Sequence, residues 1–142
     1  MTKLTNDKCF IDTNILIYCY SSSELTKQAI ARSLVDRGNI YISTQVCKEF
    51  ANTAKRKLNL GWALISQILE TFNNSATVHT NALETIQYAC KIAERYQYSF
   101  YDSLIISAAL SCNCNILFSE DMQHNQLIDN RLKIVNPFAE GA

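Results

Sequence analysis

Short, mostly apolar segments alternate along the chain with longer segments in which apolar residues recur every three or four positions. Continuous apolar segments of this length predict strands that are buried on both faces of a sheet. The predicted strands cover residues 8–11, 40–42, 77–79, 115–118 and 133–135. The longer segments predict helices over residues 15–20, 26–37, 44–58, 61–72, 82–96 and 101–111, and a brief one over 123–128. Strands that alternate with helices require right-handed crossovers, and therefore a parallel sheet covered on both faces.

Composition supports a single α/β domain over residues 1–142. The chain is 48% hydrophobic and 18% charged, which is enough apolar material for a packed core. With three glycines and one proline, it has too few turn residues for an all-β fold. The N-terminal residues lack the apolar stretch of a signal peptide, and the longest apolar run, 104–110, is far too short to cross a bilayer. We therefore expect a cytoplasmic protein without a membrane segment.

Charge and cysteine usage narrow the chemistry further. Lys plus Arg and Asp plus Glu each total 13, so bulk charge does not hold this protein to nucleic acid or membranes, and a polyanionic partner would need a local basic patch. The six cysteines are an even number, which permits three disulfides, and Cys112 and Cys114 have the spacing of half a metal site. Their apolar neighbours instead favour reduced core cysteines of a cytosolic protein.

Four acidic residues occupy unusual positions. Asp12 directly follows the first predicted strand and Asp121 closely follows a later one. Asp102 lies in the first turn of an otherwise apolar helix, and Glu49 lies on the helix that follows the second strand. Because ligands of open parallel sheets bind at the carboxyl ends of the strands, we expect these four side chains to meet at one edge.

Each acid taken alone also has an ordinary explanation. Asp12 and Asp121 could be turn or cap residues, Asp102 could favour the helix dipole, and Glu49 could be solvated beside Lys48. Together, however, four converging carboxylates repel one another unless a cation sits among them. No Lys or Arg neighbours Asp12, Asp102 or Asp121 in the sequence, so a hard divalent ion, Mg²⁺ or Mn²⁺, is the expected occupant.

Four segments resemble the motifs of PIN domains, and most of all those of VapC-type ribonuclease toxins from VapBC toxin–antitoxin pairs. They are Phe10–Tyr18, the stretch around Glu49, Tyr101–Ala109 and Leu117–Met122. The order and spacing of the acids match the family from about residue 8 to 138. The resemblance implies a three-layer α/β/α domain with a central, mainly parallel sheet. It also implies metal-dependent cleavage of single-stranded RNA by metal-activated water, an antitoxin partner and a homodimer.

The resemblance also assigns roles to individual residues. It places metal binding and catalysis on the four acids, Asp12, Glu49, Asp102 and Asp121. Asn14 and Ser119 match positions that support the acids, and we expect Asn14 to orient Asp12 and Ser119 to orient Asp121. One departure from the family pattern is Asn125, where related toxins often have glycine. We expect it to affect the backbone conformation of a loop and to leave the four acids in place.

Other residues are candidates for contacts with RNA or with a partner. Basic residues of the helix that carries Glu49, together with one histidine, are candidate RNA contacts: Lys48, Lys55, Arg56, Lys57 and His124. A solvated helix face and a plain loop histidine are the alternatives. Tyr20, Tyr98 and Tyr101 are candidate stacking residues, with core packing favoured for Tyr101. The apolar helix over 61–72 is either core or a surface for a second copy or an antitoxin helix.

Two rival functions stay open. A haloacid-dehalogenase-like phosphatase also places an Asp after its first strand. It needs a second Asp two residues later, where this chain has Asn14, and a suitable Lys before the last acidic motif, which this chain lacks. A catalytically inactive PIN-like domain that binds RNA or protein is the non-enzymatic alternative. Chelator-sensitive cleavage of RNA separates the nuclease from both.

Overall fold

A six-stranded sheet forms the centre of the computed structural model, which describes residues 7–141; residues 1–6 and 142 of the predicted domain lie outside the described part. The strands are β1 (Cys9–Ile11), β2 (Ile40–Ser43), β3 (Thr77–His79), β4 (Ile116–Phe118), β5 (Leu127–Ile128) and β6 (Leu132–Val135), in the order β3-β2-β1-β4-β6-β5. Every neighbouring pair is parallel except β5–β6, which is antiparallel. The prediction of a mainly parallel sheet is therefore confirmed.

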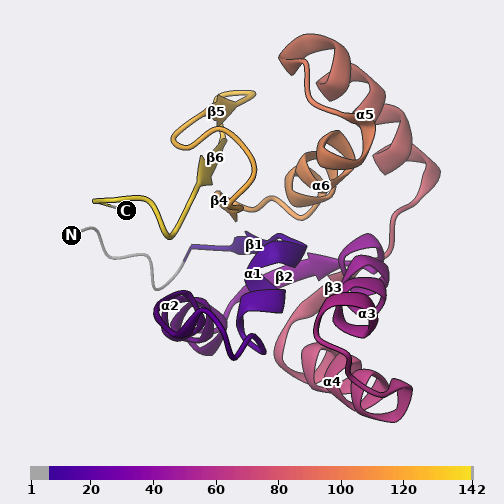
Figure 1. Ribbon diagram of the computed structural model, residues 1–142. Coiled ribbons are helices and arrows are strands. Elements are labelled where there is room, and N and C mark those ends of the chain that lie inside the picture. Colours follow the sequence, from indigo (N-terminus) through magenta and orange to yellow (C-terminus); the bar gives the residue numbers. More distant parts are fainter. Residues whose placement is uncertain (1–6, 142) are drawn as a thin grey trace.

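Helices cover both faces of this sheet. They are α1 (Thr13–Tyr18), α2 (Leu25–Asp36), α3 (Thr44–Lys57), α4 (Trp62–Ser75), α5 (Leu83–Tyr96) and α6 (Phe100–Ser111). Figure 1 shows α1 to α4 on one side of the strands and α5 and α6 on the other, which gives the predicted three-layer α/β/α arrangement. Within residues 7–141, none of the helices is long and apolar enough to cross a bilayer.

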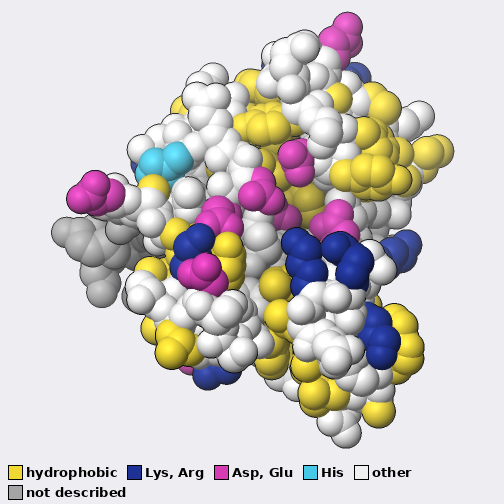
Figure 2. Space-filling view, in the orientation of Figure 1, with side chains coloured by type: hydrophobic (Ala, Val, Ile, Leu, Met, Phe, Trp, Pro, Cys, Tyr) yellow, Lys and Arg dark blue, Asp and Glu magenta, His cyan; other side chains and the backbone are white. Residues whose placement is uncertain are grey.

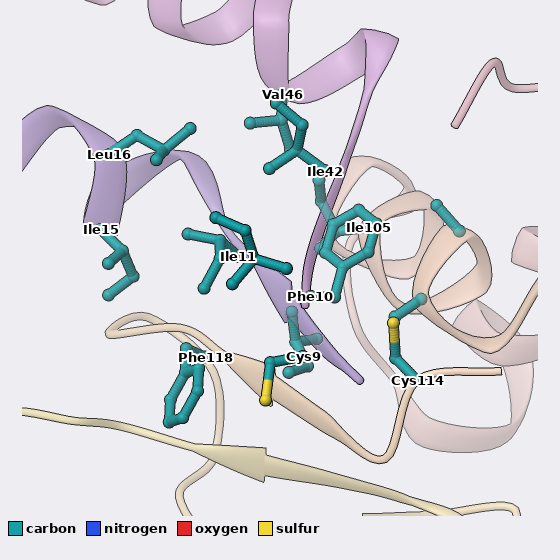
Figure 3. Close-up of a cluster of buried hydrophobic side chains, with 14 of the residues drawn as sticks. Cys9, Phe10, Ile11, Ile15, Leu16, Ile42, Val46, Ile105, Cys114 and Phe118 are labelled. Carbon is teal, nitrogen blue, oxygen red and sulfur yellow. The ribbon is translucent and has the colours of Figure 1, made fainter. Parts of the chain in front are cut away.

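Strand β1 lies between β2 and β4 in the sheet, and the core is built around it. All three residues of β1 are buried, and Phe10 and Ile11 are among the largest fully buried side chains. Figure 3 shows these residues packed among side chains of the neighbouring strands and helices. Helix α6 is buried from Ser103 to Leu110, and its Ser107 hydroxyl is satisfied by donating to the carbonyl oxygen of Thr85 at 2.7 Å. All six cysteines are free, as predicted.

The segment between β4 and β6 differs from its prediction. Residues 123–128 form no helix; Leu127 and Ile128 instead make the short edge strand β5. Asn125, Asp129 and Asn130 all have positive φ, which a right-handed helix does not allow. Asn125, at φ 70°, adopts the left-handed conformation that glycine favours, and asparagine tolerates it better than most residues. The departure at this position therefore keeps a glycine-like backbone.

Helix starts place the functional residues. Ser99 caps α6 by accepting a hydrogen bond from the backbone N–H of Asp102 at 3.2 Å. Helix α1 begins at Thr13, and Asp12 caps it by accepting a hydrogen bond from the Thr13 N–H. Asp12 is also joined to β4, because its N–H donates to the carbonyl oxygen of Phe118 at 3.0 Å. The first acid thus lies at a fixed junction of strand, helix and neighbouring strand.

Candidate functional site

The four predicted acids line one cleft of about 740 Å³. Asp12 comes from the end of β1, Glu49 from α3, Asp102 from the first turn of α6 and Asp121 from the loop after β4. Figure 2 shows acidic side chains in a row across the middle of one face of the molecule. The parallel topology therefore brings together four side chains that lie up to 109 positions apart in the sequence (12 to 121).

Asp12 is the most buried of these acids, with 6% of its surface exposed. Its Oδ1 accepts from the Thr13 N–H at 2.7 Å and its Oδ2 accepts from the Ser119 hydroxyl at 2.8 Å. Burial, and to a smaller extent the charges of Glu49 and Asp102, raise its pKa to about 7 despite these two hydrogen bonds. At neutral pH this carboxylate is therefore poised to take up either a proton or a metal ion.

None of the four acids forms an ion pair with a basic side chain of residues 7–141. Burial raises the pKa of Asp102, and the nearby charges of Asp121 and Glu49 add to the effect. Within the described part of the chain, the two ion pairs are Lys27–Glu120 and Arg95–Asp129, so neither involves one of the four acids. The four carboxylates thus form a region of concentrated negative charge without an ionic partner.

Asn14 and Ser119 both support the acids, but each contacts the acid expected for the other. The Asn14 Nδ2 donates to Asp121 Oδ2 at 3.1 Å, whereas the Ser119 hydroxyl donates to Asp12. Ser119 Oγ also accepts from the Asp121 N–H at 3.3 Å. The predicted orientation of Asp12 by Asn14 is therefore wrong. The Ser119 hydroxyl contacts the backbone N–H of Asp121 and not its carboxylate.

Two further residues hold Glu49 and are absent from the sequence predictions. The Thr13 hydroxyl donates to Glu49 Oε1 at 2.6 Å, and Gln45 Nε2 donates to Glu49 Oε2 at 2.9 Å. Gln45 Nε2 also donates to the carbonyl oxygen of Tyr101 at 3.1 Å, so it connects α3 to the start of α6. Gln45 lies one helical turn before Glu49, and this i, i+4 spacing is the signal from which its role could have been inferred.

A fifth acid, Glu120, also lines the cleft, and its charge is compensated. Its carboxylate accepts from Lys27 Nζ at 2.6 Å and from the Tyr18 hydroxyl at 2.7 Å. This contrast distinguishes Glu120 from the neighbouring Asp121, whose carboxylate accepts only from an uncharged amide among the hydrogen bonds found. Glu120 therefore ties the loop after β4 to α1 and α2.

The donor set suits a hard divalent ion. Carboxylate oxygens are the ligands that Mg²⁺ and Mn²⁺ prefer, and the raised pKa of Asp12 is the response of a buried acid that lacks a cation. As they stand, no three acidic, histidine or cysteine side chains of residues 7–141 are arranged to enclose an ion. Both Glu49 oxygens accept hydrogen bonds, Oε1 from the Thr13 hydroxyl and Oε2 from Gln45 Nε2.

The structure divides the candidate RNA contacts into two groups. Arg56 and Lys57 line the cleft on the α3 side, and Figure 2 shows basic side chains next to the acidic row. Lys48, Lys55 and His124 do not line it. The Lys55 ammonium lies 5.3 Å from the centre of the Trp62 ring, and His124 Nδ1 accepts from the Asn136 N–H at 2.9 Å.

Solved structures with this fold include several toxins. The chain is similar to a toxin–antitoxin complex from Klebsiella pneumoniae (16% identity, TM-score 0.67, covering 92% of this chain and 98% of that one). It is also similar to VapC20 of Mycobacterium tuberculosis, a sarcin–ricin loop cleaving toxin (16% identity, TM-score 0.66, covering 80% of this chain and 91% of that one). A third is VapBC2 from Rickettsia felis bound to a DNA fragment from its promoter (18% identity, TM-score 0.63, covering 90% of this chain and 98% of that one). At these identities the likeness shows the fold alone.

Sequence comparison identifies the family. No curated protein matches the chain by sequence. The family model of the PIN domain, in contrast, matches residues 9–129, a span that includes the four predicted acids as well as Asn14 and Ser119. Together with the three-layer fold, this match shows that the chain belongs to the PIN domain family.

Proposed function

We propose that this protein is a Mg²⁺- or Mn²⁺-dependent endoribonuclease that cleaves single-stranded RNA, and that it is the toxin of a toxin–antitoxin pair. The observation that carries the proposal is the meeting of four carboxylates in one cleft, none of them in an ion pair within the described residues. Membership of the PIN domain family supports the nuclease chemistry and leaves the phosphatase alternative without support.

Asp12 and Asp102 would hold the ion, and Glu49 and Asp121 would complete the site directly or through water. Bound there, a divalent ion supplies activation of a water molecule at neutral pH and stabilisation of charge on the scissile phosphate. Thr13 and Ser119 keep Asp12 in place by donating to its two oxygens. Asn14 does the same for one oxygen of Asp121. These hydrogen bonds limit the rotation of the acids and so reduce the entropy cost of binding the ion.

The chain's own residues favour direct attack by water over a covalent intermediate. The cleft residues found in the described part include no cysteine or histidine. The Ser119 hydroxyl donates its proton to a carboxylate that is also a ligand candidate, which holds the serine in a supporting position. One of the cleft carboxylates is then the group that accepts the proton of the attacking water.

Substrate binding must overcome the negative charge of the cleft. Arg56 and Lys57 are exposed on the cleft wall, where they can contact phosphates on either side of the scissile bond. Lys48 and Lys55, on the same helix but outside the cleft, have a smaller role in this proposal. Since only a few cations contribute, we expect RNA binding with a modest dependence on salt concentration.

The partner proposal rests on the solved complexes. Two of the similar structures contain a toxin with its antitoxin, and the chain covers nearly the whole length of each matched chain. We therefore propose an antitoxin that blocks the acidic cleft, and a homodimer as the assembled toxin. A small open reading frame next to this gene, whose product co-purifies with the protein and inhibits cleavage, is the expected finding.

A cleavage assay tests the nuclease directly. Purified protein is incubated with labelled single-stranded RNA and Mn²⁺, with and without chelator, beside the Asp102→Asn variant. Asp36→Asn, which changes an exposed acid of α2 outside the cleft, is the matched control. We expect cleavage by the wild type and the control, and none with chelator or with Asp102→Asn. Chelator-resistant cleavage would contradict the metal site, and RNA binding without cleavage would favour the inactive binding domain.

A further inference from the structure

Two aromatic side chains are exposed beside the acidic cleft. Tyr101 is 64% exposed and Phe100 is 40% exposed, in the residues directly before Asp102. Figure 2 shows hydrophobic side chains gathered next to the acidic row, on the side of α5 and α6. Core packing of Tyr101, favoured from the sequence, is therefore wrong, because the apolar helix α6 buries its later residues and leaves its first turn in solvent.

The position of this pair is fixed relative to the acids. The two rings pack edge to face, with their centres 5.3 Å apart and an interplanar angle of 73°. The carbonyl oxygen of Tyr101 accepts from Gln45 Nε2, the same group that donates to Glu49. Ser99 Oγ caps the same helix start by accepting from the Asp102 N–H. The Tyr101 backbone is thus held in place by a residue that also holds a cleft acid.

The other tyrosines considered as stacking residues are already occupied. The ring of Tyr20 packs against Phe50 and Phe72, at centre distances of 5.8 and 6.4 Å. The Tyr98 hydroxyl donates to Gln126 Oε1 and accepts from the Gln123 N–H. Tyr101 differs from both, since its ring contacts only Phe100 among the aromatic pairs of the described residues.

Charge decides which part of an RNA strand such a surface suits. The chain has no net charge and the nearby cleft is acidic, so phosphates gain little from long-range attraction. Nucleobases are uncharged at neutral pH, and an unpaired base can stack on an exposed aromatic ring whatever its identity. Two rings are also far less surface than the roughly 800 Å² per partner of a stable protein interface.

We propose that Tyr101, supported by Phe100, is a nucleobase-stacking subsite that holds an unpaired base of the RNA next to the scissile phosphate. This inference rests on the proposed function and adds a reason for its preference for single strands, because a base within a duplex has no free face to offer. The contact is tolerant of base identity, so it selects unpaired RNA and leaves sequence preference to other residues.

Binding of two strands that differ only in their bases tests the subsite. Labelled oligouridylate and an abasic ribose–phosphate strand of the same length are titrated in Mn²⁺ with Asp12→Asn protein, which leaves the RNA uncut. Fluorescence anisotropy should show the uridine strand binding about 5- to 100-fold more tightly than the abasic strand. Adding Tyr101→Ala should remove this difference without weakening abasic binding, and Tyr101→Phe should retain it. Trp62→Ala, which removes an equally exposed ring on α4, is the matched control.

The possible failures are distinguishable. Equal binding of both strands by the Asp12→Asn protein, or equal weakening of both by Tyr101→Ala, overturns the subsite and leaves the nuclease intact. Conversion of a dimer to a monomer by Tyr101→Ala in analytical ultracentrifugation also overturns it, by assigning the ring to a subunit interface. Absence of binding to either strand, combined with absence of Mn²⁺-dependent cleavage by the wild type, overturns the proposed function itself.

Discussion

Asp12 and Asp129 are two largely buried carboxylates whose surroundings have opposite effects. Burial alone would raise the pKa of Asp129, but hydrogen bonds from Tyr88, Tyr96 and Arg95, together with the Arg95 charge, outweigh it and lower the pKa. Around Asp12 the hydrogen bonds are too few to offset burial, and the neighbouring charges are negative, so its pKa rises to about 7.

The opposite pKa shifts distinguish Asp129, whose ionised form stabilises the fold, from Asp12, whose ionised form needs a bound cation. Asp129 joins the turn after β5 to α5, and its Arg95 partner lies 2.7 Å away. Asp12 has no such cation, and its ionised form costs folding free energy when no metal is bound. A site that lowers stability in the free protein is expected where binding of a cation is the function.

Removing the charge of Asp12 should give the largest change in activity. We expect Asp12→Asn to lower the cleavage rate by at least about 100-fold, because it removes a ligand at the centre of the site. In chelator, its free energy of unfolding should equal or exceed that of the wild type, since a poorly compensated buried charge is gone. Steady-state cleavage and urea denaturation measure the two effects. Near wild-type cleavage by the purified variant would refute the assignment.

The reciprocal substitution should act on stability alone. Asp129→Ala leaves two half-buried tyrosine hydroxyls and the exposed Arg95 without their acceptor, and the lost tyrosine hydrogen bonds should lower the free energy of unfolding by about 1–2 kcal/mol. Cleavage per folded molecule should stay unchanged, because Asp129 does not line the cleft. Urea denaturation with Asp36→Ala as control checks the cost. An unchanged unfolding free energy would contradict the stabilising role of the cluster.

The pH dependence of stability should have opposite signs for the two acids. The folded-state pKa of Asp129 is lowered, so the advantage of the wild type over Asp129→Asn is present above about pH 4 and lost as pH falls through that pKa. The folded-state pKa of Asp12 is raised to about 7, so the wild type gains stability relative to Asp12→Asn as pH falls from about 7 to 4.

Denaturation in chelator across this pH range measures both trends. The Asp12 effect corresponds to a few kcal/mol at most, on the order of 1.4 kcal/mol for each unit by which the pKa differs between the folded and unfolded states. Parallel pH profiles for the wild type and Asp12→Asn would show that Asp12 titrates normally, and would remove the electrostatic distinction between the two acids.

A smaller effect is expected from the residue that holds Glu49. Gln45→Met should lower cleavage, or raise the Mn²⁺ concentration needed for it, by about 10-fold, because Glu49 loses one of its donors. Stability should change little, since the buried Gln45 Oε1 has no hydrogen-bond partner among the described residues and its loss offsets the lost bonds. Gln67→Met on the exposed face of α4 is the control. Equal Mn²⁺ requirements for both variants would exclude a positioning role for Gln45.

Topology explains how much of the site was predictable from the sequence. Asp12 and Asp121 each follow a continuous apolar strand, and parallel strands place such residues at one edge, so the convergence of the acids could be predicted. The partners of each carboxylate could not, because the contacts of Ser119 with Asp12 and of Asn14 with Asp121 depend on side-chain rotamers between segments 107 residues apart.

Local backbone conformation and exposure account for the remaining errors. Leu127 and Ile128 fit a helix or a strand equally well, and the positive φ of Asn125 has no clear sequence signature for a residue other than glycine. The exposure of Tyr101 was not predictable from hydrophobic spacing, because α6 is apolar on all its faces and gives no periodic pattern.

Mn²⁺-dependent thermal stability tests the central claim, that the cleft acids bind a divalent ion, most directly. At an ion concentration about 100 times the dissociation constant, the wild type should gain about 2.7 kcal/mol in unfolding free energy and melt at a higher temperature. Asp129→Asn should show the same gain from a lower starting temperature, and Asp12→Asn should show little or none. Equal gains for the wild type and Asp12→Asn, or no gain for the wild type at saturating Mn²⁺ and Mg²⁺, would contradict the account.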